Sequence, residues 1–296
     1  MRSIKQNIVI RIKRCQEDHL PTIASQATSS LLQPLGFRAR LAQREVLTGT
    51  FIKTPTSHAI EILGGLGYDF VVIDEEHAPF DRAAIDLAIL AAKASGTAAF
   101  VRVASPAPAN ILSVLDCGAT GILVPHVISA TRAREIAAAA HYKGGRRGFS
   151  GSPRAGGYGA VPMWTQVDTQ DQTVTVIAQI EDPEALDEID AIAATDGIDA
   201  LFLGRGDLSV AMGAASQAAS DVKRACDKII EAAAKVGKPV AAFVSNAQDA
   251  ALLHKSGVSA FIFSSDQGLM RQAAGAALKD MQEIAQPSSA ANNGND

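Results

Sequence analysis

Short apolar runs alternate along most of the chain with longer stretches in which Ala, Leu and Ile recur at helical spacing. Short apolar runs bounded by turn residues are typical of buried strands, and the periodic stretches are typical of amphipathic helices. The pattern predicts eight strands, over residues 46–52, 69–74, 98–103, 121–125, 174–180, 199–204, 239–244 and 260–265. It predicts helices over residues 56–66, 81–95, 107–117, 129–141, 183–195, 218–237, 246–256 and 268–285.

Glycines stand where most of these helices are expected to end. Six connections that lead into a strand hold a glycine shortly before it, namely Gly67, Gly96, Gly118, Gly197, Gly237 and Gly257. A glycine at this place ends a helix in the left-handed conformation and lets the chain turn into the next strand. The repeat of strand, helix and glycine turn predicts a parallel sheet.

Parallel strands that are apolar on both faces must be covered on both faces, and eight of them close most economically into a barrel. We therefore expect an α/β fold of the (β/α)₈ TIM-barrel type. A doubly wound open sheet is the alternative. It is disfavoured because no G-x-G-x-x-G follows the first predicted strand, and GGLGYDF, residues 64–70, lies before a strand.

The two ends of the chain depart from this repeat. Residues 1–33 carry scattered basic residues around NIVIRI, and we interpret them as an N-terminal extension without a catalytic role. Residues 34–285 are expected to form one barrel domain. Residues 286–296 are polar, have almost nothing to bury, and are expected to form a disordered tail.

Composition narrows the functional classes. Hydrophobic residues make up 47% of the chain and charged residues 20%, which is typical of a globular protein with a large core. The net charge of -4 and the aromatic content of 5% give no basis for binding nucleic acid. Cys15, Cys117 and Cys226 form no C-x-x-C pair, and no apolar stretch is long enough to span a membrane. A cytoplasmic protein is expected.

Polar residues collect at the carboxyl ends of the predicted strands, while the opposite ends carry mostly glycine turns and ordinary solvated residues. In a barrel of this type the carboxyl ends form the active face. The asymmetry therefore predicts a catalytic site at this rim. The candidates are Lys53, Asp74, Glu75, Glu76, His77, Arg102, His126, Gln179, Glu181, Asp207 and Ser264 to Asp266.

Two of these acids are candidate metal ligands. Glu181 follows the fifth predicted strand and Asp207 follows the sixth, so their carboxylates lie at neighbouring strand ends. Two carboxylates with open positions and no histidine or cysteine expected nearby suit a hard divalent ion whose remaining positions are filled by water and substrate oxygens. The structural alternative treats Glu181 as a first-turn acid of a helix and Asp207 as a helix N-cap.

The sequence VVIDEEH, residues 71–77, places three acids and a histidine directly after a buried strand. We interpret the acids as groups that set the orientation and charge of His77, and we expect Glu76 to fix the loop without touching substrate. Arg102 ends another apolar strand and is expected to neutralise an enolate or carboxylate oxygen. An ion pair of Arg102 with Asp74 or Glu76 is the alternative. His126 is a weaker candidate.

These segments resemble one family. The motifs VVIDEEHAPFD, VRV, LDCGATGILVPHV, GGRRGFSG, AQIED and LFLGRGDLSVAMG, in this order, are similar to those of the HpcH/HpaI metal-dependent class II pyruvate aldolases. The similarity runs from about Phe37 to Ala285. The resemblance implies an aldehyde-lyase that cleaves a 4-hydroxy-2-oxo acid to pyruvate and an aldehyde, or runs the reverse addition, through a metal-bound pyruvate enolate.

The resemblance also assigns roles to residues. It places the metal, Mg²⁺, Mn²⁺ or Co²⁺, on Glu181 and Asp207, the catalytic histidine at His77 with Asp74 beside it, and the keto oxygen on Arg102. It implies that Gln179 lies beside the metal, that the amides of Gly206 and Asp207 bind the pyruvate carboxylate, and that Asp116 acts partly across a subunit contact. The family exchanges its last helix between subunits, which implies a trimer or a hexamer of paired trimers.

The chain departs from the family pattern at Arg205, beside the carboxylate-binding loop, and at Glu75, where a small residue is usual. Both departures leave the identity of the second substrate undetermined. A Schiff-base aldolase using Lys53 is one alternative. A lyase or binding protein for CoA thioesters, related to citrate lyase β subunits, is the other, although no basic nucleotide patch is evident.

Overall fold

The computed structural model describes residues 36–285. The expected N-terminal extension and C-terminal tail lie outside the described residues. Within residues 36–285, no helix combines the length and the apolar character needed to cross a lipid bilayer.

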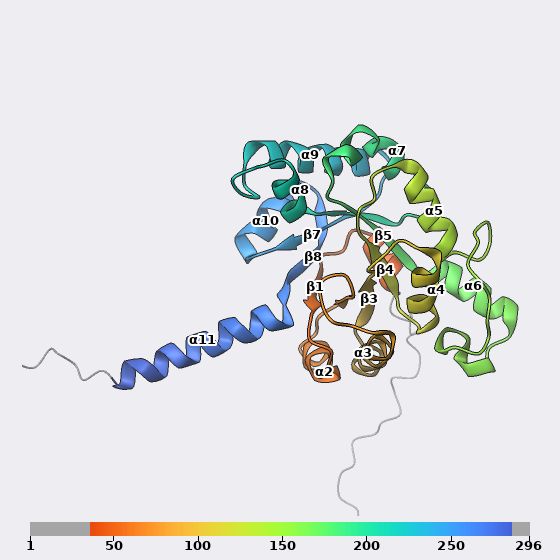
Figure 1. Ribbon diagram of the computed structural model, residues 1–296, viewed down its shortest axis with the longest axis horizontal. Coiled ribbons are helices and arrows are strands. Elements are labelled where there is room, and N and C mark those ends of the chain that lie inside the picture. Colours follow the sequence, from red (N-terminus) through yellow and green to blue (C-terminus); the bar gives the residue numbers. More distant parts are fainter. Residues whose placement is uncertain (1–35, 286–296) are drawn as a thin grey trace, which may run out of the picture. The chain divides into compact units, whose positions relative to one another are not determined.

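Eight parallel strands close into a barrel in chain order, with β8 paired to β1 (Figure 1). The predicted TIM barrel is confirmed, and every predicted strand is present with nearly the expected limits. The strands are β1 Leu47–Ile52, β2 Phe70–Asp74, β3 Ala98–Arg102, β4 Gly121–Val124, β5 Thr175–Ile180, β6 Ala200–Leu203, β7 Val240–Val244 and β8 Val258–Ser265.

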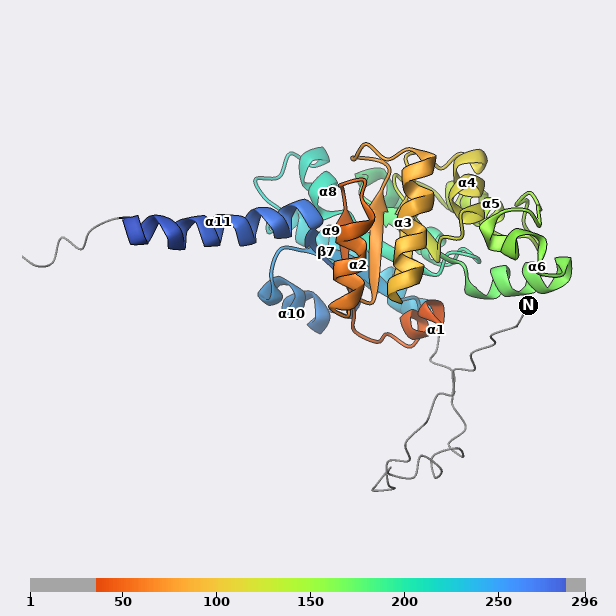
Figure 2. The same cartoon turned by 90° about the horizontal axis from the view of Figure 1, so that it is seen from below.

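Helices follow the strands on the outside of the barrel, and Figure 2 shows α2 and α3 side by side. Most of the predicted helices are confirmed: α2 Ser57–Gly65, α3 Arg82–Ser95, α4 Pro108–Asp116, α5 Ala130–Ala140, α9 Ser220–Lys235, α10 Ala247–Lys255 and α11 Asp266–Ala285. All six glycines predicted to end helices have positive φ angles, from 72° at Gly237 to 105° at Gly257.

The remaining helical segments differ from expectation. The helix expected over residues 183–195 is two short pieces, the 3₁₀ segment η2 Pro183–Asp187 and α7 Ile189–Ala193. Four further segments were not predicted: α1 Phe37–Ala42, η1 Arg154–Gly159, α6 Met163–Thr173 and α8 Arg205–Ala211.

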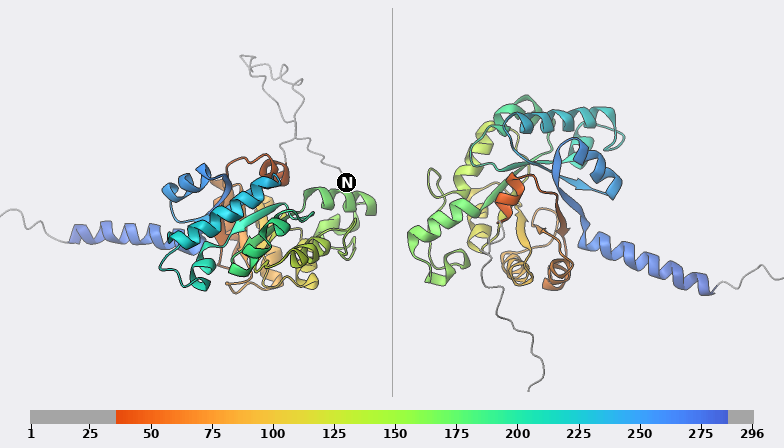
Figure 3. Two further views of the ribbon diagram at one scale, coloured as in Figure 1. Left: turned by 90° about the horizontal axis from the view of Figure 1, so that it is seen from above. Right: turned by 180° about the vertical axis from the view of Figure 1, so that it is seen from behind.

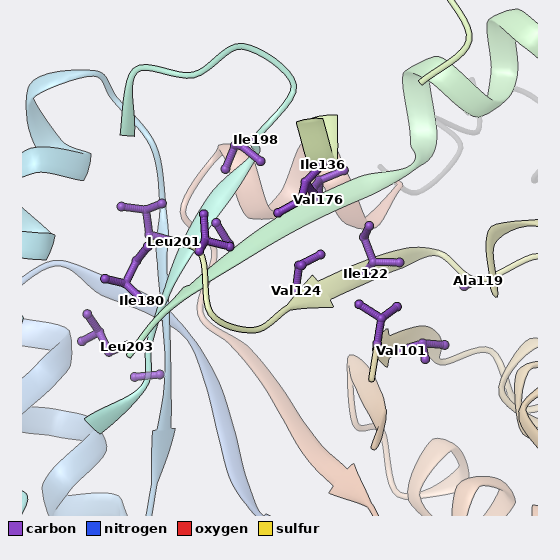
Figure 4. Close-up of a cluster of buried hydrophobic side chains, with 14 of the residues drawn as sticks. Val101, Ala119, Ile122, Val124, Ile136, Val176, Ile180, Ile198, Leu201 and Leu203 are labelled. Carbon is purple, nitrogen blue, oxygen red and sulfur yellow. The ribbon is translucent and has the colours of Figure 1, made fainter. Parts of the chain in front are cut away.

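The larger core lies between the strands and the outer helices. Alternate strand residues point outward into it, including Val101, Ile122, Val124, Val176 and Leu201 (Figure 4). Each of these side chains is completely or almost completely buried. This layer fixes which strand residues face outward, and therefore which ones face into the barrel.

A second, smaller core fills the barrel itself. Phe70, at the start of β2, and Phe100, in the middle of β3, project inward, and Phe37 of α1 packs on both, with ring centroids 5.3 and 4.8 Å away. Figure 3 shows α1 lying across this end of the barrel. Helix α1 and the aromatic layer close the amino-terminal end, so the carboxyl end is the open one.

Candidate active site

The alternation of side chains along the strands brings the polar candidates into the mouth. In β2, Phe70 and Val72 face the barrel interior, so Asp74, two residues further on, faces the same way. The same step along β3 carries the inward face from Phe100 to Arg102, and Asp74 and Arg102 are partners in the register of the two strands. The polar rim is thus the top layer of the barrel interior.

Asp74 is the centre of a buried charge cluster. It has no exposed side-chain surface, and Arg102 donates to both of its carboxylate oxygens, from Nε at 2.9 Å and from Nη2 at 2.8 Å. Lys53 Nζ lies 3.1 Å from the second oxygen. Burial alone would raise the pKa of Asp74, but the hydrogen bonds and charges of Arg102 and Lys53 outweigh it and lower the pKa below 3.8.

The ion pair that sequence reasoning left open for Arg102 is therefore present in the structure. Its Nε also lies 3.2 Å from Glu76 Oε2, and only 8% of its side chain is exposed. Among the described residues, no side chain or carbonyl binds Nη1. Arg102 is held rigidly by two carboxylates and keeps one N–H₂ group for another ligand.

The two glutamates after Asp74 have different roles. Glu75 holds the loop after β3, because its carboxylate accepts from the amide of Ala104 and from Asn110 Nδ2 at 3.0 to 3.2 Å. Glu76 was expected to fix the loop, and this was wrong. Its side chain is 12% exposed and faces Arg102 and two histidine rings. The adjacent acids separate in this way because consecutive side chains leave the chain in different directions.

His77 lies at the outer edge of this cluster, with 57% of its side chain exposed. Its backbone amide donates to Asp74 Oδ1 at 3.2 Å, whereas its ring Nε2 lies 3.7 Å from Glu76 Oε2. The acid beside the ring is therefore Glu76, while Asp74 positions the backbone. An exposed imidazole next to a carboxylate is suited to exchange protons with solvent.

Glu181 directly follows β5 and is almost completely buried, with 2% of its side chain exposed. It accepts from the His126 amide at 3.0 Å and from Gln179 Nε2. Burial raises the pKa of Glu181 to about 7, and the charge of Asp207 acts in the same direction. Gln179 is itself buried, and its Oε1 has no partner among the described residues. A carboxylate in this setting is short of positive charge.

Asp207 is exposed in the first turn of α8, next to Gly206. The N-cap alternative for Asp207 is wrong, because α8 begins at Arg205 and the N-cap is Gly204. Arg205 does not face the mouth as a free cation. Its Nη1 and Nη2 donate to the two oxygens of Asp249 in α10, at 2.9 and 2.6 Å, and Nη2 also donates to the carbonyl of Phe243.

Asp116 stands apart from the residues at the mouth. It ends α4, and its Oδ1 lies 3.3 Å from Arg147 Nη2. Its neighbours around a surface cavity of about 470 Å³ include Arg82, Asp86 and Arg154. Within one chain the structure therefore brings Asp74, His77 and Arg102 together and places Gln179 beside Glu181. The loop of Gly206 and Asp207 follows Gly204, which lies against Glu181, whereas Asp116 is not in this group.

Two residues were undervalued by sequence reasoning. His126 contacts Glu181 through its amide and approaches Glu76 with its ring. Asp266, at the start of α11, is buried and accepts from the amides of Lys53 and Thr54 at 2.8 and 3.1 Å. Both follow the carboxyl end of an apolar strand, which is the signal that placed them among the candidates, but the sequence assigned neither a role in the site.

Comparison with known proteins finds one family that matches most of the chain. Residues 47–273 match the family described as HpcH/HpaI aldolase/citrate lyase. A relative named 5-keto-4-deoxy-D-glucarate aldolase, from Enterobacter sp. (strain 638), is 35% identical over 242 residues, which are 81% of this chain and 94% of that relative.

Solved structures give the same result. An HpcH/HpaI aldolase/citrate lyase family protein from Burkholderia cenocepacia J2315 is 28% identical, with a TM-score of 0.79, over 83% of this chain and 98% of that chain. A protein named citrate synthase SbnG is 30% identical, with a TM-score of 0.77, over 84% of this chain and 98% of that chain. The similarity covers the barrel as a whole and is not confined to one motif.

Proposed function

The chain belongs to the HpcH/HpaI aldolase/citrate lyase family, and we propose that it is a class II pyruvate aldolase. The reaction is cleavage of a 4-hydroxy-2-oxo acid to pyruvate and an aldehyde, or the reverse addition. The observation that carries the proposal is the buried Glu181 carboxylate, short of positive charge, at the same barrel mouth as the fixed guanidinium of Arg102. The aldehyde is left open.

The donor set fits a divalent cation. Glu181 and Asp207 supply carboxylate oxygens, and the repulsion between them is what a dication relieves. Gln179 offers a further buried oxygen beside Glu181. Mg²⁺, Mn²⁺ and Co²⁺ all suit such a site. When bound, the ion supplies Lewis-acid polarisation of the 2-oxo acid carbonyl.

The chain's own residues supply the rest of the chemistry. Arg102 directs its remaining N–H₂ group at the oxygen that gains negative charge as pyruvate becomes its enolate. Asp74 and Glu76 hold that guanidinium in place, so no reorganisation is needed during the reaction. His77 carries the proton between the hydroxyl of the substrate and solvent, with Glu76 stabilising the charged ring.

Binding of the pyruvate carboxylate falls to the loop after β6. The amides of Gly206 and Asp207 lie in the first turn of α8, where helix N–H groups lack intrahelical acceptors and attract anions. Arg205 is already paired with Asp249, so we assign it the role of holding this loop against α10. It is not a substrate ligand in this proposal.

We propose a homo-oligomer, a trimer or a hexamer of paired trimers. Helix α11 exposes four large apolar residues at helical spacing on one face, Met270, Leu278, Met281 and Ile284. Figure 1 shows α11 leading away from the barrel. An apolar cavity of about 440 Å³ between α10 and β8 is a fitting seat for the same helix of a second copy. Asp116 would then act at a neighbouring site.

The buried thiols fit a reducing location. Cys117 and Cys226 are free and buried. Burial raises the pKa of both thiols, to about 11 for Cys226, so neither is reactive. We therefore place the enzyme in the cytoplasm.

The test is exchange of the pyruvate methyl protons with D₂O, followed by NMR. Chelator-stripped protein should be inactive, addition of Mn²⁺ or Mg²⁺ should start the exchange, and Glu181→Ala should abolish it. Glu184→Ala is the matched control, since Glu184 lies in η2 one residue beyond Pro183 and has no role in the proposal. No exchange with any of the metals would overturn the aldolase assignment.

One competing function has support, because a structural neighbour is named citrate synthase and the family name includes citrate lyase. Thermal shifts measured with pyruvate, oxaloacetate and acyl-CoA separate the two functions: stabilisation by acyl-CoA alone favours thioester chemistry.

The Schiff-base alternative needs Lys53, whose Nζ forms an ion pair with Asp74. Covalent trapping of pyruvate by borohydride in the presence of chelator would support it.

A further inference from the structure

His126 has a backbone conformation that few side chains adopt. Its φ is 54°, in the left-handed region that favours glycine, although Pro125 and Val127 on either side leave no glycine to absorb the turn. Such conformations persist where the surrounding structure requires them, and they cluster at functional sites. At His126 the turn aims the amide at Glu181 Oε1, 3.0 Å away, and carries the ring over the same carboxylate.

The imidazole Nδ1 faces two carboxylates, with Asp182 Oδ2 3.0 Å away and Glu181 Oε1 3.5 Å away. The shorter contact is a hydrogen bond to Asp182, which requires the proton to be on Nδ1. In the neutral ring this leaves the lone pair on Nε2. Carboxylate, imidazole and metal arranged in this order are a common feature of metal sites, because the carboxylate fixes the tautomer and raises the basicity of the ring.

The free side of the ring faces other possible ligands. Nε2 lies 3.7 Å from Glu76 Oε1, and one donor atom from each of Glu76, His126 and Glu181 lies within 4.8 Å of the other two. Ligands about 2.1 Å from one ion lie roughly 3 to 4 Å apart, so small movements bring these atoms around a single cation. Glu76 Oε2 is buried and is ion-paired with Arg102 Nε at 3.2 Å, which leaves Oε1 as the oxygen that faces His126.

We propose that His126 Nε2 is a direct ligand of the divalent ion in this chain. The inference rests on the proposed metal site at Glu181 and adds a nitrogen donor to its carboxylates. Glu76, between the two histidine rings, would supply a further oxygen donor. A mixed nitrogen and oxygen site binds Co²⁺ and Mn²⁺ in preference to Mg²⁺, which dehydrates reluctantly and favours oxygen ligands.

The direct test is pulsed electron paramagnetic resonance of Mn²⁺ added to the chelator-stripped full chain. A nitrogen modulation from a coordinated imidazole is expected in the wild type and should disappear in His126→Asn. Asparagine suits this position because it tolerates the left-handed conformation. The matched control is His77→Asn, which removes the other ring beside Glu76 and should leave the modulation intact.

Calorimetric titrations give a second readout that is independent of activity. His126→Asn should weaken Co²⁺ binding about 10- to 100-fold and change Mg²⁺ binding far less. Asp182→Asn keeps the imidazole ring, so it should retain the nitrogen modulation while weakening Co²⁺ binding. This variant serves as the test if His126→Asn fails to fold. Wild-type protein that binds Mn²⁺ without nitrogen modulation overturns this inference alone. Protein that binds no divalent ion overturns the aldolase assignment as well.

Discussion

The four consecutive residues Asp74 to His77 have different surroundings although they are adjacent in the chain. Asp74 neutralises Arg102 and Lys53 in the barrel interior, and Glu75 holds the next loop through Ala104. Glu76 and His77 share the open side of the mouth. The cost of placing three acids after a buried strand is offset because each carboxylate meets its own set of donors.

Replacement of Asp74 by asparagine should destabilise the protein by about 3 kcal/mol, since it leaves the charge of Arg102 buried with only Glu76 as a partner. Urea unfolding at pH 7 measures this. The cations lower the pKa of Asp74 below 3.8, so the stabilisation is present above that pH and is lost as the pH falls through the folded pKa. Glu75→Gln, whose side chain keeps an acceptor for Ala104, should change stability by less than about 1 kcal/mol.

Glu181 should make the metal-free protein less stable as the pH rises. Its pKa is raised from 4.5 to about 7, so between these values the folded protein holds a proton that the unfolded chain has released. The free energy of unfolding therefore falls across this interval. Burial disfavours the charged form of the His126 ring, but the hydrogen bond to Asp182 and the charge of Glu181 outweigh burial and raise the pKa of His126 above 6.5. The free energy of unfolding therefore falls further as the pH rises through the folded pKa of His126.

Urea unfolding of wild type and Glu181→Gln at pH 5 and pH 8, both with chelator, checks this. The wild type should lose more stability between the two pH values than the variant does. Equal losses would mean that Glu181 ionises as freely in the folded protein as in the unfolded chain. Added Mn²⁺ should stabilise the wild type more at pH 8 than at pH 5, because metal binding requires the deprotonated carboxylate.

At the scale of strands and helices, close approach between neighbours depends on glycine at one position in β4. A Cβ on Gly121 would lie 2.2 Å from the carbonyl oxygen of Thr175 and 2.5 Å from the ring of Phe100. Gly121→Ala should cost about 1–3 kcal/mol or more in unfolding free energy. Gly65→Ala, in α2 with nothing within 4 Å of the added Cβ, should be neutral or stabilising by up to about 1 kcal/mol.

The strands and most helices were predictable because the spacing of apolar residues shows which side chains are buried, and in a barrel the buried faces of strands and helices repeat regularly. Helix α6 was missed for the same reason: its only buried residues are Gln166 and Val167, so it has no apolar stripe to detect. Helix α8 is short and contains Gly206, which disfavours helix in isolation. These two segments are specified by tertiary contacts more than by their own pattern.

The candidate site divides in a similar way. Asp74, Arg102 and Glu181 were predictable, because a charged residue at the end of an apolar strand must face the mouth. Their hydrogen-bond and ion-pair partners were not predictable, since Glu75 and Glu76 have the same chemistry and differ only in the direction of their side chains. The contact of His126 with Glu181 depends on a left-handed turn after Pro125 that no pattern in the sequence indicates.

At the scale of the whole molecule, one chain holds the residues of the proposed metal and enolate site but keeps Asp116 away from them. The apolar face of α11 is uncovered among the described residues, and charged groups on it should prevent assembly. We expect Leu278→Glu combined with Met281→Glu to convert the proposed oligomer to a monomer in light scattering. Lys279→Gln, on an exposed residue of the same helix, should leave assembly unchanged.

The same double variant tests whether the site is complete in one chain. If Asp116 serves a neighbouring subunit, the monomer should bind Mn²⁺ as the wild type does, because Glu181 and Asp207 come from one chain. Its pyruvate exchange should fall about 100-fold or more, since a group that assists proton transfer is missing. Asp116→Asn in the intact oligomer should lose a similar factor. A monomer with full exchange activity would show that Asp116 acts only through its contact with Arg147.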